Sequence, residues 1–399
     1  MIFEKRKCVI ISDVTYRGRT PKEDYAQLIS FLDTVFFTYD PPETKRDFLN
    51  LLPKLYKPEY DPCYNNFIVK EGDEIKGAVG LYYDELMAGG VKLRCGGIGN
   101  VAVAEDSRSK GYMIECMNMA MEDMKLSGAD YGLLGGQRQR YGYFGFEPAG
   151  VSYNFNVNKS NIRHCFGKDA KSGLEVKEVK PGDSRTLALI DEILRKEPFY
   201  TIHPPEAMYD ILCSWRRKPY AAFSGEEFKG FFTRNYEGRV ADFKAASAGD
   251  IEKTVLAAFE FLQNDNNQFS VPAFDTAAID RFTQFAEGWS LHHSKSYVVI
   301  NFENTVRALL NVRAASGPIN DGELSLYIRG WAGDEKITLR VKNGEAEVST
   351  AKGEVDLEIS HHEAIRFLFS LSSSHRRNMT NPAAQWFPLP LYSYDFDTA

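Results

Sequence analysis

The sequence lacks several features that mark specialised classes of protein. No apolar run approaches the roughly 18 residues that a membrane helix needs, so we expect no membrane span. The first residues, MIFEKRKCVI, lack the long apolar stretch of a signal peptide, and nothing in them marks the chain for secretion. The six cysteines (Cys8, Cys63, Cys95, Cys116, Cys165 and Cys213) are scattered without a C-x-x-C spacing. This pattern indicates reduced thiols in a cytoplasmic protein, and neither a disulfide framework nor a zinc site.

An excess of positive charge is also missing. The chain has 48 Lys and Arg residues against 55 Asp and Glu residues, a net charge of -7. Because phosphate binding needs basic patches, this balance argues against a nucleic acid partner, and it is compatible with a cationic, amine-bearing substrate. The rest of the composition is that of an ordinary globular protein, with 43% hydrophobic residues. The length of 399 residues suggests two or three domains.

The first stretch of the chain, residues 1–158, mixes predicted helices and strands. Amphipathic periodicity predicts helices over 23–36 and 111–126. The methionines at helical spacing in the second of these, Met117, Met121 and Met124, are interpreted as core residues. Apolar runs predict strands over 66–70, 75–83, 92–103 and 131–134.

The middle stretch, residues 159–297, repeats that order loosely. The pattern predicts a helix over 186–194 and another that begins at Ile251. Strands are predicted over 174–179, 220–223, 228–233 and 239–244. The order is that of a degenerate second copy of the first domain.

The last stretch, residues 298–399, has a different character. A strand is predicted over 322–329, and Asn343-Gly344 is a strong hairpin signal between strands over 336–341 and 345–350. Ser360 and Glu363 form a capping-box pattern that opens a helix. These elements indicate a small α+β domain. The tail after Pro382 is rich in proline and aromatic residues, so we expect it to dock.

The segment from Val101 to Met113 has the pattern of a phosphate-binding site. An apolar strand leads into a loop with Arg108 and Lys110, and a helix opens at Gly111. The N-terminus of a helix has unsatisfied N–H groups and a favourable dipole for an anion, and glycine permits close approach to the backbone. The alternative interpretation is a solvated loop with a glycine turn.

This segment resembles motif A of the GNAT acyltransferases, Gln/Arg-x-x-Gly-x-Gly/Ala, with Met113 at the last position. The chain as a whole resembles the Eis (enhanced intracellular survival) acetyltransferases of that superfamily. The resemblance implies acetyl-CoA as the cofactor and the backbone of Val101 and Val103 as partners of its pantetheine arm. It implies that the pyrophosphate is held by the amides of the following loop: Arg108, Ser109, Lys110, Gly111, Tyr112 and Met113.

A second segment, Gly135 to Phe146, resembles the Eis pattern Tyr-Gly-x-Phe-Gly-Tyr, with phenylalanine as the last residue. Tyr141 falls at the position of the family's general acid. When an amine attacks a thioester, a thiolate leaves, and a phenol can protonate it once the site adjusts its pKa. The alternative is that Tyr141 and Tyr143 are only aromatic packing in a glycine-rich loop.

The resemblance also implies roles for the last domain and the chain end. In the Eis family the last domain is sterol-carrier-protein-like, and the terminal carboxylate acts as the base. Here that group belongs to Ala399, where better-known members end in phenylalanine. The alternative is a tail that only seals an interface. The family further implies a homohexamer.

Other candidate sites are weak. His361-His362-Glu363 is interpreted as a surface helix start because no second histidine follows at helical spacing, and Arg216-Arg217-Lys218 as a solvated turn. No metal site is expected. In the middle stretch, residues 246–250 match the position of the phosphate loop but offer no basic residue, so only the first copy should bind cofactor.

The sequence therefore predicts tandem GNAT folds of mixed α/β type, with a central sheet flanked by helices, and then a small α+β sterol-carrier-protein-like domain. The expected protein is a cytoplasmic acetyl-CoA-dependent N-acetyltransferase that acts on a small-molecule or peptide amine. One alternative is a non-catalytic scaffold that binds an apolar ligand. Another is aminoacyl transfer from charged tRNA, which the lack of a basic groove disfavours.

Overall fold

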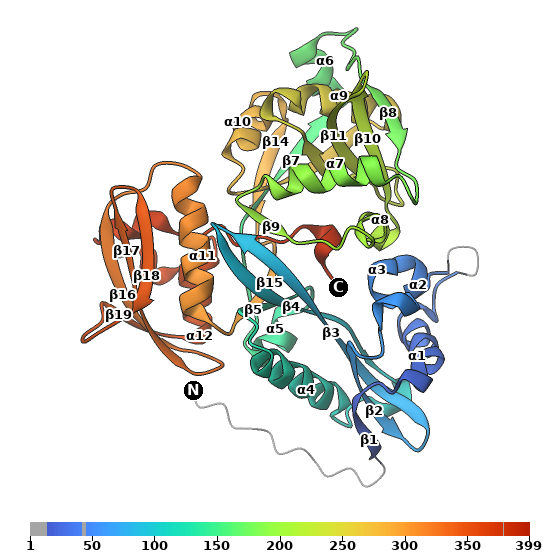
Figure 1. Cartoon of the computed structure of the whole chain (residues 1–399), viewed down its shortest axis with the longest axis vertical. Coiled ribbons are helices and arrows are strands. Elements are labelled where there is room, and N and C mark those ends of the chain that lie inside the picture. The colour runs from blue at the N-terminus through green and yellow to red at the C-terminus, as the bar shows by residue number, and fades with distance from the viewer. Residues whose placement is uncertain (1–13, 42–44, 378) are drawn as a thin grey trace. The chain divides into compact units, whose positions relative to one another are not determined.

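The computed structural model describes residues 14–41, 45–377 and 379–399. Cys8 lies outside these ranges. The chain forms two compact units: the first holds the residues up to Tyr83, Gly96–Gly128 and Ala399, and the second holds Asp84–Cys95 and Ala129–Thr398. Strands β3 (Glu74–Ala88) and β4 (Val91–Val103) contribute residues to both units. The elements are labelled in Figure 1.

The first unit contains the antiparallel strands β1, β2 and β3, followed in the sheet by β4. Helix α4 packs against β2 and buries Met117, Met121 and Met124, as the periodicity predicts, and it buries Cys116 as well. The other elements of this unit are β1 (Val14–Arg19), α1 (Tyr25–Phe37), α2 (Phe48–Leu51), α3 (Pro53–Tyr56), β2 (Asn66–Glu71) and α4 (Tyr112–Leu126).

In the second unit, the sheet continues from the start of β4 in the order β5-β15-β6. Strand β9 pairs with β3. Strand β15 therefore lies between β5 and β6 although about 150 residues of chain separate it from them. A separate three-stranded sheet has the order β13-β7-β14. The strands are β5 (Tyr131–Leu134), β6 (Glu147–Ala149), β7 (Ser152–Asn158), β9 (Phe199–Thr201), β13 (Asn266–Pro272), β14 (Gly288–His292) and β15 (Lys295–Val299).

A four-stranded sheet of the second unit has the order β12-β11-β10-β8. Phe231, Phe232 and Thr233 of β11 are buried in succession, so both faces of this sheet are covered, and α7 and α9 pack on β11 and β12. The elements are α5 (Arg138–Tyr141), α6 (Lys159–Phe166), β8 (Glu175–Glu178), α7 (Ser184–Arg195), α8 (Met208–Cys213), β10 (Lys218–Ser224), β11 (Glu227–Arg234), β12 (Val240–Ala245), α9 (Ile251–Leu262) and α10 (Thr276–Phe285).

The end of the chain forms a sheet with the order β18-β17-β16-β19. Asn343 (φ 53°) and Gly344 (φ 80°) make the predicted hairpin turn, and both partners of the Ser360–Glu363 capping box are bonded as predicted. The elements are α11 (Phe302–Ala315), β16 (Gly322–Arg329), β17 (Asp334–Lys342), β18 (Glu345–Thr350), β19 (Leu357–Ser360), α12 (His361–Phe369) and α13 (Ser374–Arg377).

The predicted docking of the tail is confirmed. Trp386, Leu389, Leu391 and Phe396 have no exposed surface, and the indole of Trp386 donates to the carbonyl of Asn320 at 2.9 Å. The tail fills the core of the second unit because its apolar side chains join those of α11, α12 and β16. Among the described residues, no helix is long and apolar enough to cross a membrane.

Candidate functional site

The predicted phosphate loop follows β4 in the first unit. A short 3₁₀ turn (Glu105–Ser107) leads to Ser109 (φ 71°) and Gly111 (φ 92°), and α4 begins at Tyr112. Both residues have left-handed backbone conformations, which glycine tolerates and serine rarely adopts. No side chain among the described residues caps the start of α4. The first amides of this helix are therefore available to an anion.

The two basic side chains of this loop each lie near a carboxylate. Arg108 is two-thirds exposed and lies 3.7 Å from a carboxylate oxygen of Glu105. Lys110 pairs with Glu71 at 2.7 Å, and the buried ring of Tyr112 directs its hydroxyl to the same carboxylate. The positive charge of Lys110 is thus shared with Glu71, whereas Arg108 remains directed to solvent.

Strand β4 changes direction just before the segment predicted to pair with pantetheine. Asn100 has a left-handed φ of 38°, and its Nδ2 donates to Oδ1 of Asn66 at 2.7 Å. Beyond it, Ala102 is buried while Val101 and Val103 on either side are half-buried, which is ordinary strand alternation. An irregular strand exposes backbone groups that a regular ladder would use. No sequence pattern singled out Asn100, although asparagine is among the residues that adopt this conformation most readily.

The last residue lies against the same strand. A Cβ added at Gly99 would meet the Cβ of Ala399 at 2.9 Å and its carboxyl carbon at 3.2 Å. One added at Gly97 would stand 3.8 Å from the Ala399 Cβ. Ala399 is therefore adjacent, within the first unit, to the strand that carries Val101 and Val103. The absence of a side chain at Gly99 makes this approach possible.

Tyr141 belongs to the second unit, at the end of the single turn α5. Its ring is buried, and it packs so closely on Gly136 that a Cβ there would lie 2.5 Å from ring atom Cε2. Burial raises the pKa of the Tyr141 phenol above its ordinary value of about 10, and the Arg140 guanidinium partly opposes that rise. The phenol is consequently protonated at neutral pH and can act as a proton donor.

Two predictions about charged clusters are wrong for one residue of each cluster, although Arg216 and Lys218 are exposed and a helix begins at His361 as predicted. Arg217, expected in a solvated turn, is 9% exposed and donates to Asp242 at 2.7 Å, and Asp242 also accepts from Thr233 at 2.5 Å. His361, expected at the surface, is buried and accepts from the amide of Trp331 at 3.0 Å. Burial lowers the pKa of His361 to about 3, so its ring is neutral. In both cases a partner distant in sequence covers the side chain.

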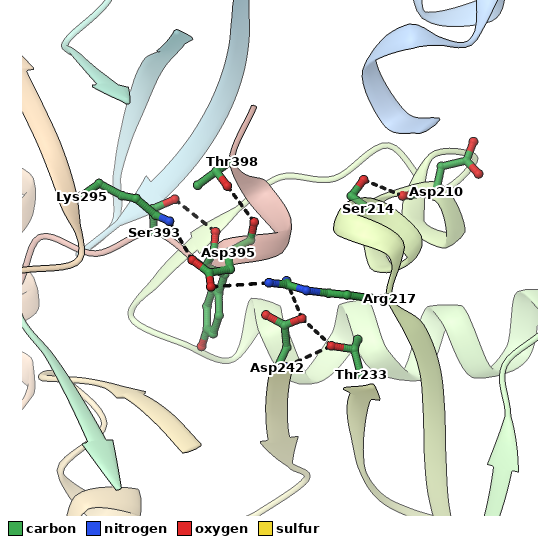
Figure 2. Close-up of polar contacts among 10 residues, drawn as sticks. Asp210, Ser214, Arg217, Thr233, Asp242, Lys295, Ser393, Asp395 and Thr398 are labelled. Carbon is green, nitrogen blue, oxygen red and sulfur yellow. Dashed lines mark hydrogen bonds and ion pairs between the residues drawn. The ribbon is translucent and has the colours of Figure 1, made fainter. Parts of the chain in front are cut away.

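Arg217 and Lys295 bind the tail through Asp395, as Figure 2 shows. Asp395 lies 3.4 Å from Arg217 and 2.7 Å from Lys295. Although burial raises the pKa of Asp395, these two cations outweigh that effect and the pKa is lowered. Two residues later, Asp397 contacts His203 at 2.6 Å and Thr201 at 2.8 Å. The tail is thus bound through charged side chains as well as apolar packing.

Residues 16–149 match a family model described as an acetyltransferase (GNAT) domain. This segment is therefore a GNAT acetyltransferase domain of mixed α/β fold, which confirms the predicted fold class and the predicted class of enzyme, an N-acyltransferase. No curated protein matches the sequence.

Several solved structures are similar to nearly the whole chain. A GCN5-related N-acetyltransferase from Anabaena variabilis aligns with a TM-score of 0.67 and 16% identity, over 95% of this chain and 97% of that one. One from Kribbella flavida aligns with a TM-score of 0.62 and 15% identity, over 89% and 88%. Eis1 from Mycobacterium abscessus aligns with a TM-score of 0.59 and 12% identity, over 88% of each chain. At these identities the likeness establishes the fold alone.

Proposed function

We propose that this chain is an N-acetyltransferase that moves the acetyl group of acetyl-CoA to a primary amine by direct attack. The observation that carries the proposal is the start of α4: an uncapped helix N-terminus preceded by two left-handed residues, Ser109 and Gly111, inside a GNAT domain. Such a terminus suits a pyrophosphate because its amides and dipole both favour negative charge.

The residues present fit coenzyme A. The amides of Ser109, Gly111, Tyr112 and Met113 would hold the pyrophosphate, whereas those of Arg108 and Lys110 donate to the carbonyls of Glu105 and Ser107. The backbone of Val101 and Val103 would pair with the pantetheine arm. When bound, acetyl-CoA supplies a thioester carbon that an amine can attack. The new bond joins the amine nitrogen to the acetyl carbon, and the bond to sulfur breaks, so the sulfur must gain a proton and the nitrogen must lose one.

Tyr141 is the proposed proton donor to the departing thiolate. Its buried phenol is protonated at neutral pH, and the cationic Arg140 stabilises the phenolate that forms. Removal of the phenolic hydroxyl should therefore lower kcat much more than it changes the KM for acetyl-CoA. A general acid of this kind typically contributes about 100- to 10,000-fold to the rate.

The carboxylate of Ala399 is the proposed proton acceptor from the amine. Its position beside Gly99 of β4 supports this role. A terminal carboxylate with an ordinary pKa of about 3.5 is a weak base for an ammonium group, so we propose that a water molecule carries the proton between them. The homohexamer of the Eis family is a further proposal, which light scattering on the purified protein tests.

The experiment is thiol release from acetyl-CoA in the presence of spermine, kanamycin or a lysine-containing peptide. We expect turnover with at least one amine, a kcat lowered by about 100- to 10,000-fold but still measurable in Tyr141→Phe, and a large loss on deletion of Ala399. Absence of turnover with every amine, together with lipid that copurifies with the protein, would favour the apolar-ligand scaffold. Turnover that survives Tyr141→Phe would remove the phenol from the mechanism but leave the transferase activity.

A further inference from the structure

The turn that presents Tyr141 is too short to hold its own conformation. Helix α5 has four residues, and helices of that length are unstable in isolation. Its backbone bonds include those from the amides of Arg140 and Tyr141 to the carbonyl of Gln137, at 3.0 and 3.2 Å, and one from the amide of Gly142 to the carbonyl of Arg138. The conformation of Tyr141 therefore depends on contacts from outside the turn.

The first external contact is made by a buried carboxylate. The side chain of Glu147, on β6, is 5% exposed and accepts from Arg138 at the start of α5, from Nε at 3.1 Å and from Nη2 at 2.9 Å. The same carboxylate accepts from Nη1 of Arg366 at 3.1 Å. Two guanidinium groups thus neutralise one buried carboxylate, and one of them belongs to α12 near the end of the chain.

The second external contact is on the other side of Tyr141. His362, in the first turn of α12, places its Nε2 2.9 Å from the carbonyl of Gly142, the residue after Tyr141. Three residues further, a Cβ at Gly145 would lie 3.0 Å from the ring of Trp331, whose amide is bound by His361. The end of the chain therefore contacts the residues after Tyr141 directly, and it reaches Arg138 before Tyr141 through the shared carboxylate of Glu147.

We propose that Glu147, Arg366 and His362 are positioning residues that fix the Tyr141 turn for proton donation, so that α12 of the C-terminal α+β segment supports catalysis in the GNAT domain. This inference rests on the proposed role of Tyr141 as general acid. These three residues touch no reacting atom. His362 contacts the carbonyl of Gly142, and Glu147, which also binds Arg366, holds the guanidinium of Arg138. Because Tyr141 lies between Arg138 and Gly142 in the chain, these contacts fix the position of its phenol.

The test combines variants of these residues with Tyr141→Phe. We expect Glu147→Gln and Arg366→Met each to lower kcat by roughly 10- to 100-fold, as small misplacements of a catalytic group do, with an unchanged KM for acetyl-CoA. Thiol release is measured with the amine from the panel that reacts fastest. In the Tyr141→Phe background the same changes should cost nothing further, because the group they position is gone.

Two comparisons separate positioning from simple loss of structure. His362→Gln retains an amide N–H donor for the Gly142 carbonyl and should retain most of the kcat that His362→Phe loses. Arg340→Met is the matched control, since Arg340 pairs with Glu323 at 2.6 Å in the same C-terminal segment, far in sequence from α12. It should leave kcat unchanged. Thermal unfolding of each variant reports whether the fold is intact.

Two results would overturn the inference. The first is an equal loss from Glu147→Gln in the Tyr141→Phe background, which would mean that the carboxylate acts independently of the phenol. The second is full kcat in both Glu147→Gln and Arg366→Met while Tyr141→Phe has lost most of its kcat. If instead Tyr141→Phe retains wild-type kcat, the proposed general-acid role of Tyr141 fails as well. The single variant Tyr141→Phe reveals this outcome without the double variants, so the two failures are distinguishable.

Discussion

At the scale of the residue, Ala399 and β4 approach each other at a place where only hydrogen occupies the side-chain position. The Cβ that alanine would add at Gly99 meets two atoms of Ala399 within 3.2 Å, whereas one at Gly97 stands at 3.8 Å, an ordinary contact. A side chain at Gly99 would therefore collide with the proposed base, whereas a side chain at Gly97 would make only an ordinary contact with it.

We expect Gly99→Ala to displace Ala399 and to lower kcat by roughly 10- to 100-fold, because the proposed base would move away from the amine. The matched control is Gly97→Ala, which should cost much less. The measurement is steady-state thiol release with both variants at saturating acetyl-CoA. Equal kcat values in the two variants would contradict a catalytic role for the end of the chain.

Arg140 offers a second prediction at this scale, about pH. A general acid works while it is protonated, so kcat should fall as the pH rises through the pKa of Tyr141. Arg140 lowers that pKa, and its removal in Arg140→Leu should shift the alkaline fall in kcat to higher pH. The pH profile of kcat between about pH 7 and 11 measures this shift. If the alkaline fall in kcat occurs at the same pH in Arg140→Leu, or if it persists in Tyr141→Phe, a group other than Tyr141 causes it.

At the scale of the element, α4 owes its proposed role to its first turn. The strand, the loop and the helix were predictable because each has a local pattern, and Gly111 adopts the left-handed conformation that its position suggests. The relative importance of the loop side chains was not predictable, since Lys110 is paired with Glu71, whose place in the sequence is some forty residues earlier.

This arrangement predicts unequal effects on coenzyme A binding. Arg108→Ala should weaken binding less than about fivefold, because the side chain is exposed and its charge is screened. Gly111→Ala should weaken it more, by about 5- to 30-fold, since a side chain at φ 92° costs roughly 1–2 kcal/mol. Isothermal titration of coenzyme A into each variant gives both values. The reverse order would indicate that side-chain charge, and not the backbone, holds the pyrophosphate.

At the scale of the whole molecule, the second unit joins segments that are distant in sequence through ion pairs around two buried carboxylates, Asp242 and Glu147. Arg217, on the loop before β10, is bound to Asp242 on β12 and reaches Asp395 in the tail (Figure 2). Glu147 joins Arg138 to Arg366 in the same way. A buried pair of this kind is costly to break because it leaves one charge without its partner.

Arg217→Met should lower the free energy of unfolding by about 3–5 kcal/mol, since Asp242 is then buried without its cation. The double variant Arg217→Met with Asp242→Leu should recover much of this loss, because no isolated charge remains. Urea denaturation followed by fluorescence gives both values. A double variant as unstable as the single one would indicate that Arg217 contributes mainly through Asp395 and the tail.

The sequence by itself determined the helices and strands with a local period, the Asn343-Gly344 turn, the Ser360 capping box, the apolar docking of the tail and the GNAT class of the first domain. The helices, strands, turn and capping box depend on residues a few positions apart, and short-range steric and hydrogen-bonding preferences suffice to fix them. The docking of the tail follows from its apolar composition, and the GNAT class follows from the resemblance of motif A. Only the tertiary structure decided that Arg217 and His361 are buried, that Ala399 lies against Gly99, and that α12 contacts the Tyr141 turn. Each of these depends on which distant partner supplies a charge, a donor or an empty side-chain position, and no local pattern encodes that choice.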